Sequence, residues 1–416
     1  MESETLTPPP LLNQPLKLPN GAIIKNRLAK SAMSENMGTP KHLPSIELFR
    51  LYETWADGGI GLCITGNIMV DASALGEPHN VVIDKNADGK KELASWAKAG
   101  TQNYTHLWAQ LNHPGKQSPK ILSPTPVAPS AIPFSSSLNK MFNCPRALSE
   151  NEILEIIQKF AYAAKEVKDA GFTGVQIHGA HGYLVSQFLS PKHNQRQDRW
   201  GGSLENRMRF LVEVYQHIRS AVGPEFPVGV KLNSADFQKG GFSEEDSILV
   251  AKKLSEIGVD LIEVSGGNYE APSMTGTRFK PSTVKREAYF LDYVTKLKKE
   301  ISTPLLLTGG FRTPRFMEEI LKSNALDMIG LARPLAIDPD FPNKILSGAP
   351  EPSLVHPIRS GFKSLDSLFA VEITWYTQQL HRIGQGKRPN PKANVLFSMA
   401  KTAADLGFSA LSRTRA

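Results

Sequence analysis

The stretch Thr173-Gly-Val-Gln-Ile-His-Gly-Ala-His-Gly-Tyr183 is a short β-prone run that ends in two histidines and a tyrosine. His178 and His181 are three residues apart, and Tyr183 follows two residues later. If the run is a strand of a larger sheet, three proton donors stand together at its carboxyl end. Such a group is sufficient to hold a carbonyl oxygen and to protonate a neighbouring carbon.

Seven similar runs recur along the chain, mostly with an amphipathic helical pattern between them. The runs are nearly continuous in hydrophobicity, which is typical of parallel strands covered on their outer face. Eight β/α units predict a (β/α)8 TIM barrel of the α/β class. A doubly wound open sheet is the alternative, but no Gly-x-Gly-x-x-Gly turn follows the first run. The expected strands are Arg27–Met33, Gly61–Val70, Tyr104–Leu111, Thr173–His178, Pro227–Leu232, Leu261–Ser265, Pro304–Thr308 and Asp327–Leu331.

Two of the intervening segments carry clear helix signals. Ser149 and Glu152 form a capping-box pattern, an apolar face follows them, and Gly171 stands where a C-cap is expected. A second helix is expected from about Ser203 to Ala221.

Four segments depart from a minimal barrel. Leu16–Ile24 is expected to form an N-terminal hairpin that closes the barrel bottom. Residues 112–148 and 268–285 form long loops after strands three and six, at the face where barrel enzymes place their sites. We expect one barrel unit at 1–349 and a partly helical C-terminal extension at 350–416, with a break at Gly384–Pro391.

Composition narrows the class of protein. The length of 416 residues suits one barrel with insertions and a tail, and no apolar run approaches the ~18 residues that span a bilayer. Met1–Pro10 is acidic and proline-rich without an apolar signal-peptide core, so we expect a cytoplasmic protein. Two cysteines, Cys63 and Cys144, exclude a disulfide framework and a four-thiolate iron–sulfur site.

The formal net charge of +8 raises the question of a nucleic-acid partner. The basic residues are scattered along the chain rather than clustered, which favours a solvated surface over a nucleic-acid face. One local group, Arg278, Lys280, Lys285 and Arg286, is the best candidate for an anionic ligand such as a dinucleotide phosphate.

In a barrel, chemistry collects at the carboxyl ends of the strands, and nearly every expected strand end carries a suitable group. Taken alone, a glutamine or serine there is more often a local cap, and a histidine pair is often structural or a metal site. No carboxylate completes a zinc triad at helical spacing, so no metal is expected. The groups are Ser34, Gly66, Gln110, His113, His178, His181, Tyr183, Lys231, Gly309-Gly310 and Arg333.

The last two units predict a phosphate site. Gly309-Gly310 allows the backbone to approach an oxyanion closely after strand seven, and Arg333 offers a bidentate fork after strand eight. Loops after strands seven and eight are the usual phosphate position in this fold. A structural turn and a surface arginine are the alternative.

Three further groups suit a flavin. Lys231 lies among apolar neighbours, and a buried lysine needs an anionic partner, which the N1/O2 region of a reduced flavin provides. Gln110 offers an amide that matches the pyrimidine edge of the isoalloxazine ring, and Ser34 is placed to reach the O4/N5 edge. Together with the phosphate site, these groups indicate a flavin mononucleotide (FMN) across the barrel mouth.

The chain resembles the old yellow enzyme family, the NADH:flavin oxidoreductases, over about residues 10–345. The strongest match is Asn194-x-Arg196-x-Asp198-x-Trp200-Gly-Gly-Ser203-x-x-Asn206-Arg207, which is similar to the family's long motif after strand four. The His-x-x-His-x-Tyr arrangement lies just upstream of it. Ser31-Ala-Met-Ser34, Gln110 and Arg333 are similar to the family's first-strand segment, third-strand glutamine and phosphate arginine.

This resemblance implies a role for each matching residue. The implied flavin-ring contacts are Ala32, Met33, Ser34, Gly66, Gln110 and Lys231, and the implied phosphate contacts are Gly309, Gly310, Ala332 and Arg333. His178 and His181 are implied to hydrogen-bond the substrate's carbonyl or nitro oxygen, and Tyr183 is implied to donate the proton.

Three positions depart from the family pattern. Lys231 stands where members commonly have arginine, so the charge is kept but the bidentate geometry is lost. Ser34 replaces threonine or cysteine, which is expected to alter the flavin potential. Ala332 replaces the usual glycine before the phosphate arginine.

The implied activity is transfer of hydride from NAD(P)H, through flavin N5, to the β-carbon of an electron-poor alkene. Tyr183 would protonate the α-carbon, and a phenol with a pKa of ~10 stays protonated for that task at neutral pH. The expected partners are small molecules. Neither nucleic acid nor a membrane is expected, and the protein could form a homo-oligomer. The basic residues near 278–286 favour NADPH as the donor.

Three other interpretations stay open. Dienoyl-CoA reductase-like relatives carry an iron–sulfur cluster and a second dinucleotide domain, for which this chain lacks the cysteines and the length. A tRNA dihydrouridine synthase is also an FMN barrel, but it needs a catalytic cysteine after strand three, where this chain has His113-Pro-Gly and Cys144 lies too far on. A non-catalytic flavin-binding protein is the third, and the intact His178, His181 and Tyr183 argue against it.

Overall fold

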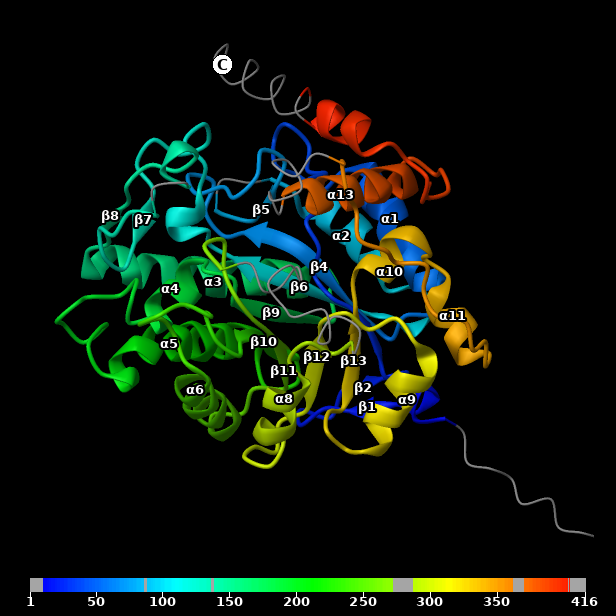
Figure 1. Ribbon diagram of the computed structural model, residues 1–416. Helices are drawn as coiled ribbons and strands as arrows, with labels where there is room; N and C mark the ends of the chain where they lie inside the picture. Colours follow the sequence, from blue (N-terminus) through cyan, green and yellow to red (C-terminus); the bar gives the residue numbers. More distant parts are fainter. Residues whose placement is uncertain are drawn as a thin grey trace, which may run out of the picture.

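The computed structural model describes residues 10–85, 88–135, 138–271, 287–361, 370–402 and 404. In this part of the chain, eight parallel strands close on themselves because the first, β3, pairs with both β4 and β13 (Figure 1). Helices cover the outside of the closed sheet. The (β/α)8 barrel that the sequence predicts is therefore confirmed, and the doubly wound sheet is excluded.

All eight barrel strands lie where the hydrophobic runs predict them, with ends shifted by up to three residues. They are β3 (Leu28–Lys30), β4 (Leu62–Met69), β6 (His106–Asn112), β9 (Gly174–Gly179), β10 (Val228–Asn233), β11 (Leu261–Ser265), β12 (Leu305–Thr308) and β13 (Met328–Leu331). A short β5 (Val81–Val82) adds to the edge of β4. The largest difference is at β3, which ends at Lys30, so that residues 31–34 follow the strand rather than belong to it.

The helices begin at the capping residues that the sequence indicates. Ser149 caps α3 with a complete capping box to Glu152, and Ser203 caps α5 through the backbone N–H of Asn206. The principal helices are α1 (Ile46–Asp57), α2 (Lys90–Gly100), α3 (Glu150–Asp169), α4 (Leu184–Leu189), α5 (Leu204–Val222), α6 (Glu244–Glu256), α8 (Leu291–Leu297), α9 (Pro314–Lys322), α10 (Arg333–Ile337), α11 (Phe341–Leu346) and α13 (Ala370–Gly384).

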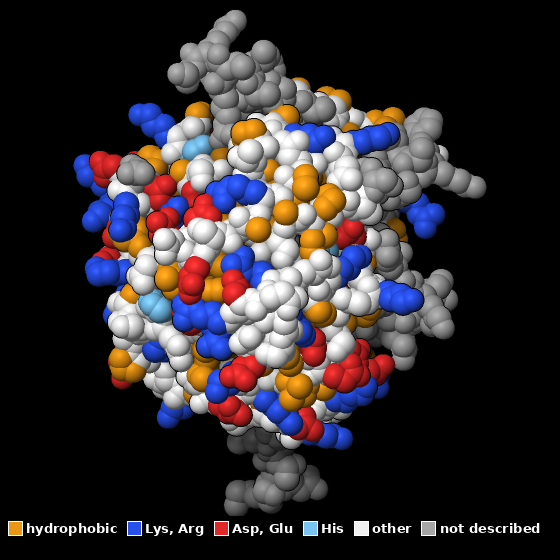
Figure 2. Space-filling model, turned by 90° about the vertical axis from the view of Figure 1, so that its left-hand side faces the viewer, with side chains coloured by type: hydrophobic (Ala, Val, Ile, Leu, Met, Phe, Trp, Pro, Cys, Tyr) orange, Lys and Arg blue, Asp and Glu red, His pale blue; other side chains and the backbone are white. Residues whose placement is uncertain are grey.

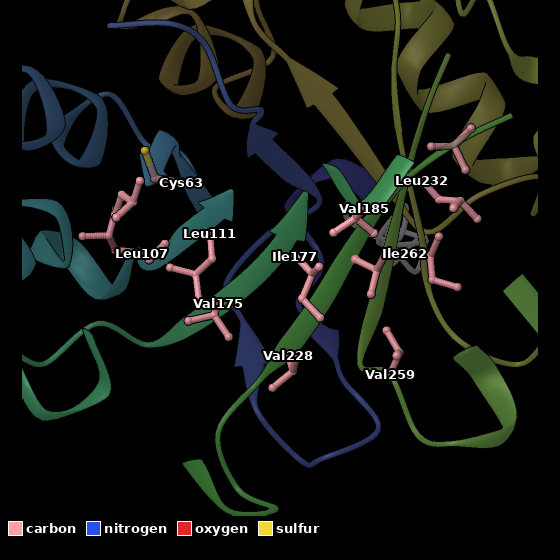
Figure 3. Close-up of a cluster of buried hydrophobic side chains, with 14 of the residues drawn as sticks. Cys63, Leu107, Leu111, Val175, Ile177, Val185, Val228, Leu232, Val259 and Ile262 are labelled. Carbon is pink, nitrogen blue, oxygen red and sulfur yellow. The ribbon is translucent and has the colours of Figure 1, made fainter. Parts of the chain in front are cut away.

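The apolar core has an outer and an inner part. Alternate residues of each strand point outward and pack against the helices; Figure 3 shows part of this layer, with Leu107 and Leu111 of β6, Val175 and Ile177 of β9, and Val228 and Leu232 of β10. The inner part lies at the bottom of the barrel around Trp108, which is fully buried. A Cβ atom on Gly174 or Gly229 would lie 2.4 or 2.8 Å from the Trp108 ring, so both positions need glycine.

The N-terminal hairpin is confirmed. Leu16–Lys17 (β1) pairs antiparallel with Ile23–Ile24 (β2), and the buried side chains of Leu16, Leu18 and Ile24 join the inner core. The hairpin therefore seals the end of the barrel opposite the carboxyl ends of the strands, which leaves only the other end open for a site.

The long loop after strand three is more ordered than an unstructured insertion. It contains the 3₁₀ turns η3 (Gly115–Gln117) and η4 (Leu138–Lys140) and the two-stranded ribbon of β7 (Val127–Ala128) and β8 (Arg146–Ala147). In the second long loop, only residues 268–271 lie in the described part of the chain. The basic group Arg278, Lys280, Lys285 and Arg286 lies outside the described residues.

In the C-terminal extension, α13 ends at Gly384, where the sequence predicts a break. No helix among the described residues is long and apolar enough to cross a membrane. On the face that carries β7 and β8, Lys and Arg side chains are interspersed with Asp and Glu rather than gathered into one patch (Figure 2).

Candidate active site

The two histidines and the tyrosine meet at the carboxyl end of β9, as their spacing predicts. His178 Nε2 lies 3.2 Å from His181 Nδ1, and the Tyr183 ring packs edge-on against the His178 ring at 4.8 Å between centroids. His181 has a positive φ of 63°, so the chain turns back immediately after the strand. This turn brings three side chains from six residues into contact.

The hydrogen bonds around the histidines define their tautomers. Asn67 Oδ1 can only accept, so His178 Nδ1, 2.8 Å away, carries the hydrogen. His178 Nε2 then accepts from His181 Nδ1–H, and His181 Nε2 accepts from the Ser265 hydroxyl at 2.7 Å. Between the rings, a ligand oxygen can therefore accept a hydrogen bond from His181 Nδ1–H, whereas His178 Nε2 can only accept one from a ligand hydroxyl.

The histidine pair is neutral at physiological pH. Burial, followed by the charges of His181 and Lys231, lowers the pKa of His178 well below its usual value. Burial and Lys231 lower the pKa of His181 in the same direction. Lys231 acts on both because β10 pairs with β9 in the register that sets Lys231 beside His178.

Tyr183 is buried and hydrogen-bonded to a second tyrosine. Its hydroxyl lies 2.9 Å from the hydroxyl of Tyr269 and 3.5 Å from Asn67 Nδ2. Burial, with added effects from Tyr269, raises the pKa of Tyr183 well above its usual value, so the phenol keeps its proton at neutral pH. Tyr269, in the loop after β11, was not expected from the sequence.

A chain of buried polar side chains crosses the barrel interior below these donors. Gln110 Nε2 donates to Gln176 Oε1 at 2.7 Å, and Gln176 Nε2 donates to Glu263 Oε2 at 2.8 Å. Glu263 Oε1 accepts from Thr308 at 2.8 Å and pairs with Lys231 Nζ at 3.1 Å. Gln110 and Lys231, predicted from separate strands, therefore belong to one connected network.

This network corrects one step of the sequence argument. From the sequence, a buried Lys231 is expected to need the flavin as its anionic partner. The structure supplies a protein carboxylate, that of the fully buried Glu263, through the strand pairing of β10 with β11. Glu263 therefore compensates the charge of Lys231 without a ligand. Lys231 still belongs to the site, because it lies beside His178.

Residues 32–35 form a partly buried segment at the end of β3. The Ser34 hydroxyl donates to the partly buried carboxylate of Glu77. Burial raises the pKa of Glu77. Ala32 packs against the inner core, and Met33 against the outer one.

Gly66 lies directly against this segment at a bulge in β4. Its N–H is hydrogen-bonded to the Glu35 carboxylate at 3.0 Å, and a Cβ there would lie 2.4 Å from the Met33 carbonyl oxygen. Glycine is required for that close approach.

The predicted phosphate residues also come together. Tyr289 links them, because its hydroxyl lies 3.3 Å from Arg333 Nη2 and 2.8 Å from where a Cβ of Gly310 would stand. Gly310 has a φ of 84°, and Gly309 accepts a hydrogen bond from the Tyr289 N–H at 3.0 Å. Ala332 is the residue before α10, so Arg333 starts that helix. Arg333 and the Gly309–Gly310 pair therefore lie next to each other, on either side of Tyr289.

The motif after strand four is structural. Asn194 Nδ2 donates to the carbonyl oxygens of Phe188 and Trp200, and Arg207 forms a 2.6 Å ion pair with Asp246. Arg196 Nη1 donates to Leu148 O at 2.6 Å. The motif thus shapes the connection from α4 to α5 and anchors the long loop after β6.

One predicted strand-end residue lies apart from the others. His113 lines a separate cavity of about 370 Å³ with Asp71 and Lys159, and its Nδ1 accepts from the Gly115 N–H at 3.1 Å. Burial lowers the pKa of His113 to about 4.

The site residues that the sequence does not predict are Asn67, Glu77, Gln176, Glu263, Ser265, Tyr269 and Tyr289. No group of three or more metal-binding side chains occurs within the described ranges.

Residues 11–351 match the model of the NADH:flavin oxidoreductase / NADH oxidase family. The chain belongs to this family. It is 36% identical over 397 residues to the NADH-dependent flavin oxidoreductase iliE of Hypocrea jecorina, covering 88% of this chain and 94% of that protein. It is 38% identical over 336 residues to the NADH-dependent flavin oxidoreductase nadA of Aspergillus parasiticus, covering 78% of this chain and 75% of that protein.

Solved structures agree on the fold. A 2-naphthoyl-CoA reductase complex superposes with a TM-score of 0.74 at 27% identity, over 82% of this chain and 53% of that protein. An old yellow enzyme homologue from Zymomonas mobilis superposes with a TM-score of 0.70 at 24% identity, over 93% of this chain and 99% of that protein.

As a member of this NADH:flavin oxidoreductase family, the protein is an NAD(P)H-dependent flavin oxidoreductase of the old yellow enzyme type, with FMN as cofactor. The chemistry of the donor set fits that cofactor. At the phosphate end, the Arg333 guanidinium and the Gly309–Gly310 turn lie on the same tyrosine, Tyr289, while Lys231 and Gln110 offer a cation and an amide inside the barrel.

Proposed function

We propose that the protein is an ene-reductase, which reduces the carbon–carbon double bond of α,β-unsaturated carbonyl or nitro compounds. The carrying observation is the contact of two neutral histidines with one protonated tyrosine at the same strand end, with His178 and Tyr183 buried and His181 partly buried. FMN, when bound, supplies the hydride that it has received from NAD(P)H. The remaining tasks fall to the side chains of this chain.

Holding the substrate oxygen is the proposed task of His178 and His181. His181 Nδ1–H is the donor toward that oxygen, and His178, whose own Nδ1–H is held by Asn67, orients it. Between the buried His178 and Tyr183, water is scarce, so a hydrogen bond to a developing negative charge is strong. Neutral rings suit this task because the pair stays in one protonation state across the neutral pH range. The nearby Lys231 adds positive potential without direct protonation of the substrate.

Delivering the proton to the α-carbon is the proposed task of Tyr183. Its raised pKa keeps the phenol protonated, and its ring contact with His178 sets the hydroxyl beside the oxygen-binding pair. The hydroxyl of Tyr269, at 2.9 Å, holds the Tyr183 hydroxyl in place before transfer.

We further propose that Ala32, Met33, Ser34, Gly66, Gln110 and Lys231 border the flavin ring and that Gly309, Gly310, Ala332 and Arg333 hold its phosphate. The contacts among them support this assignment, since Gln110 and Lys231 share one network and Arg333 borders Gly310. The N–H of Gly66 is already hydrogen-bonded to Glu35, so Gly66 would contribute close approach rather than a donor.

The test is an absorbance spectrum of the purified protein, followed by titration with NADH and NADPH in the presence and absence of cyclohexenone. The proposal predicts a flavin spectrum that bleaches with the reduced nicotinamide and recovers, without oxygen, on adding cyclohexenone. A flavin that bleaches but is not reoxidised by any conjugated enone or nitroalkene would refute the ene-reductase assignment. A flavin that never bleaches would indicate a non-catalytic binding protein.

A further inference from the structure

Helix α13, in the C-terminal extension, reaches the proposed flavin site through three side chains. Glu372 Oε1 lies 3.0 Å from Arg333 Nη1. Thr377 Oγ1 donates to the backbone oxygen of Ser34 at 3.1 Å, and His381 Nε2 donates to the backbone oxygen of Glu35 at 2.9 Å. These contacts join residues that are 39, 343 and 346 positions apart in the sequence.

The helix is firmly packed rather than loosely attached. Trp375, Leu380 and Ile383 are buried, and α13 lies against α1 and α10 (Figure 1). At its end, a Cβ on Gly384 would lie 2.8 Å from the Glu47 carbonyl oxygen of α1. Such close packing fixes the positions of Glu372, Thr377 and His381 relative to the barrel.

The contact with Arg333 determines how that arginine points. Its Nη1 is held by the Glu372 carboxylate and its Nη2 by the Tyr289 hydroxyl, which stands over Gly310. A long side chain with several rotamers is thereby restrained in the orientation that borders the glycine pair. The contacts of Thr377 and His381 act differently, because they hold backbone atoms of the segment proposed to border the flavin ring.

We propose that α13 is part of the FMN-binding unit, with Glu372 positioning Arg333 for the phosphate and Thr377 and His381 positioning the Ser34–Glu35 backbone for the ring. The FMN-binding unit then extends from the barrel through Gly384 instead of ending near residue 349. This inference rests on the proposed function, since it takes Arg333 and Ser34 as cofactor-binding residues. Glu372, Thr377 and His381 are positioning residues, because each acts through another residue.

The test compares FMN with riboflavin, which has the same ring but no phosphate. The full-length holoenzyme and its variants are freed of flavin, and each is titrated with both ligands by quenching of flavin fluorescence. The variants are Glu372→Ala, Glu372→Gln, Thr377→Val and Thr377→Ser. Glu319→Ala is the matched control, because Glu319 is an exposed carboxylate paired with Arg315 at 2.8 Å on α9. Circular dichroism of each flavin-free variant verifies folding.

Glu372→Ala is expected to raise the Kd for FMN about ten-fold while changing that for riboflavin less than about two-fold. Glu372→Gln should stay within about two-fold of wild type, since its amide oxygen still accepts from Arg333. Thr377→Val should weaken both ligands and Thr377→Ser should restore both. Glu319→Ala should match wild type.

An unchanged or lower FMN Kd in Glu372→Ala overturns the positioning role of Glu372, as does an equal weakening of riboflavin. If Glu372→Ala does not fold, the Thr377→Val and Thr377→Ser pair decides whether α13 serves the site, and equal affinities in that pair overturn the inference. Wild-type protein that binds neither flavin would instead overturn the proposed function, so the two failures are distinguishable.

Discussion

Lys231 Nζ lies 3.1 Å from Glu263 Oε1, with both side chains almost completely buried. The pair places a positive charge beside His178 and at the same time limits its strength, because Glu263 neutralises it from the adjacent strand. The carboxylate of Glu263 is therefore expected to set how strongly this site stabilises a negatively charged reduced flavin.

Glu263→Gln should raise the flavin reduction potential. The amide oxygen can still accept from Gln176, but the charge of Lys231 is left uncompensated, which stabilises the anionic reduced state. A rise on the order of 30 mV corresponds to about 1.4 kcal/mol for two electrons. Lys231→Gln should lower the potential. Spectroelectrochemical titration measures both, and a shift of the same sign in the two variants would contradict the electrostatic argument.

Tyr183→Phe should slow alkene reduction about 10²- to 10⁴-fold and leave flavin reduction by NAD(P)H nearly unchanged. The phenyl ring retains the packing against His178 but has no proton to give. Stopped-flow spectroscopy separates the two half-reactions. Equal slowing of both would eliminate Tyr183 as the proton donor.

Tyr269→Phe should slow the same step by about ten-fold, because it removes the hydroxyl that holds Tyr183 at 2.9 Å. Since Tyr269 acts only through Tyr183, the double variant should be no slower than Tyr183→Phe alone. A double-mutant cycle on the alkene half-reaction checks this. Multiplicative losses would mean that the two tyrosines act independently.

The elements of the barrel could be predicted because their signals are local. Each strand is a run of β-branched and apolar residues, and Ser149 and Ser203 start the helices that the capping pattern indicates. His178, His181 and Tyr183 were found for the same reason, since six residues of one strand end contain all three.

The polar residues inside the barrel that Gln110 and Lys231 contact could not be predicted, because those contacts depend on how distant strands meet. The strand runs are nearly continuous in hydrophobicity, yet β9 alternates: Val175 and Ile177 face outward while Gln176 joins the interior network. This period of two was the available signal for the interior polar residues. Asn67 follows a bulge in β4, which changes the register that spacing alone would give.

His178→Ala should weaken the binding of phenolic ligands about ten- to hundred-fold. A phenol resembles the enolate of the proposed reaction; its oxygen can accept from His181 Nδ1–H while its hydroxyl hydrogen is donated to His178 Nε2. Titration of the flavin absorbance with a phenol gives the Kd. His217→Ala is the control, since that histidine hydrogen-bonds a backbone oxygen of its own helix, α5. Unchanged phenol affinity in His178→Ala would count against the oxygen-binding role.

His113 should make the stability of the protein depend on pH. Its pKa is about 4 in the fold because of burial, against about 6.5 in the unfolded chain, so the unfolded state binds the extra proton first on acidification. The free energy of unfolding therefore falls as the pH drops below 6.5 and levels off, for this residue, below 4. Between pH 7.5 and pH 5, the contribution of His113 lowers the free energy of unfolding by about 2 kcal/mol. In His113→Asn, the side-chain oxygen still accepts from the Gly115 N–H, but this contribution to the pH dependence should be absent. Urea unfolding of wild type and variant at the two pH values measures the difference. Identical pH dependence in wild type and variant would show that His113 is protonated as readily in the fold as outside it.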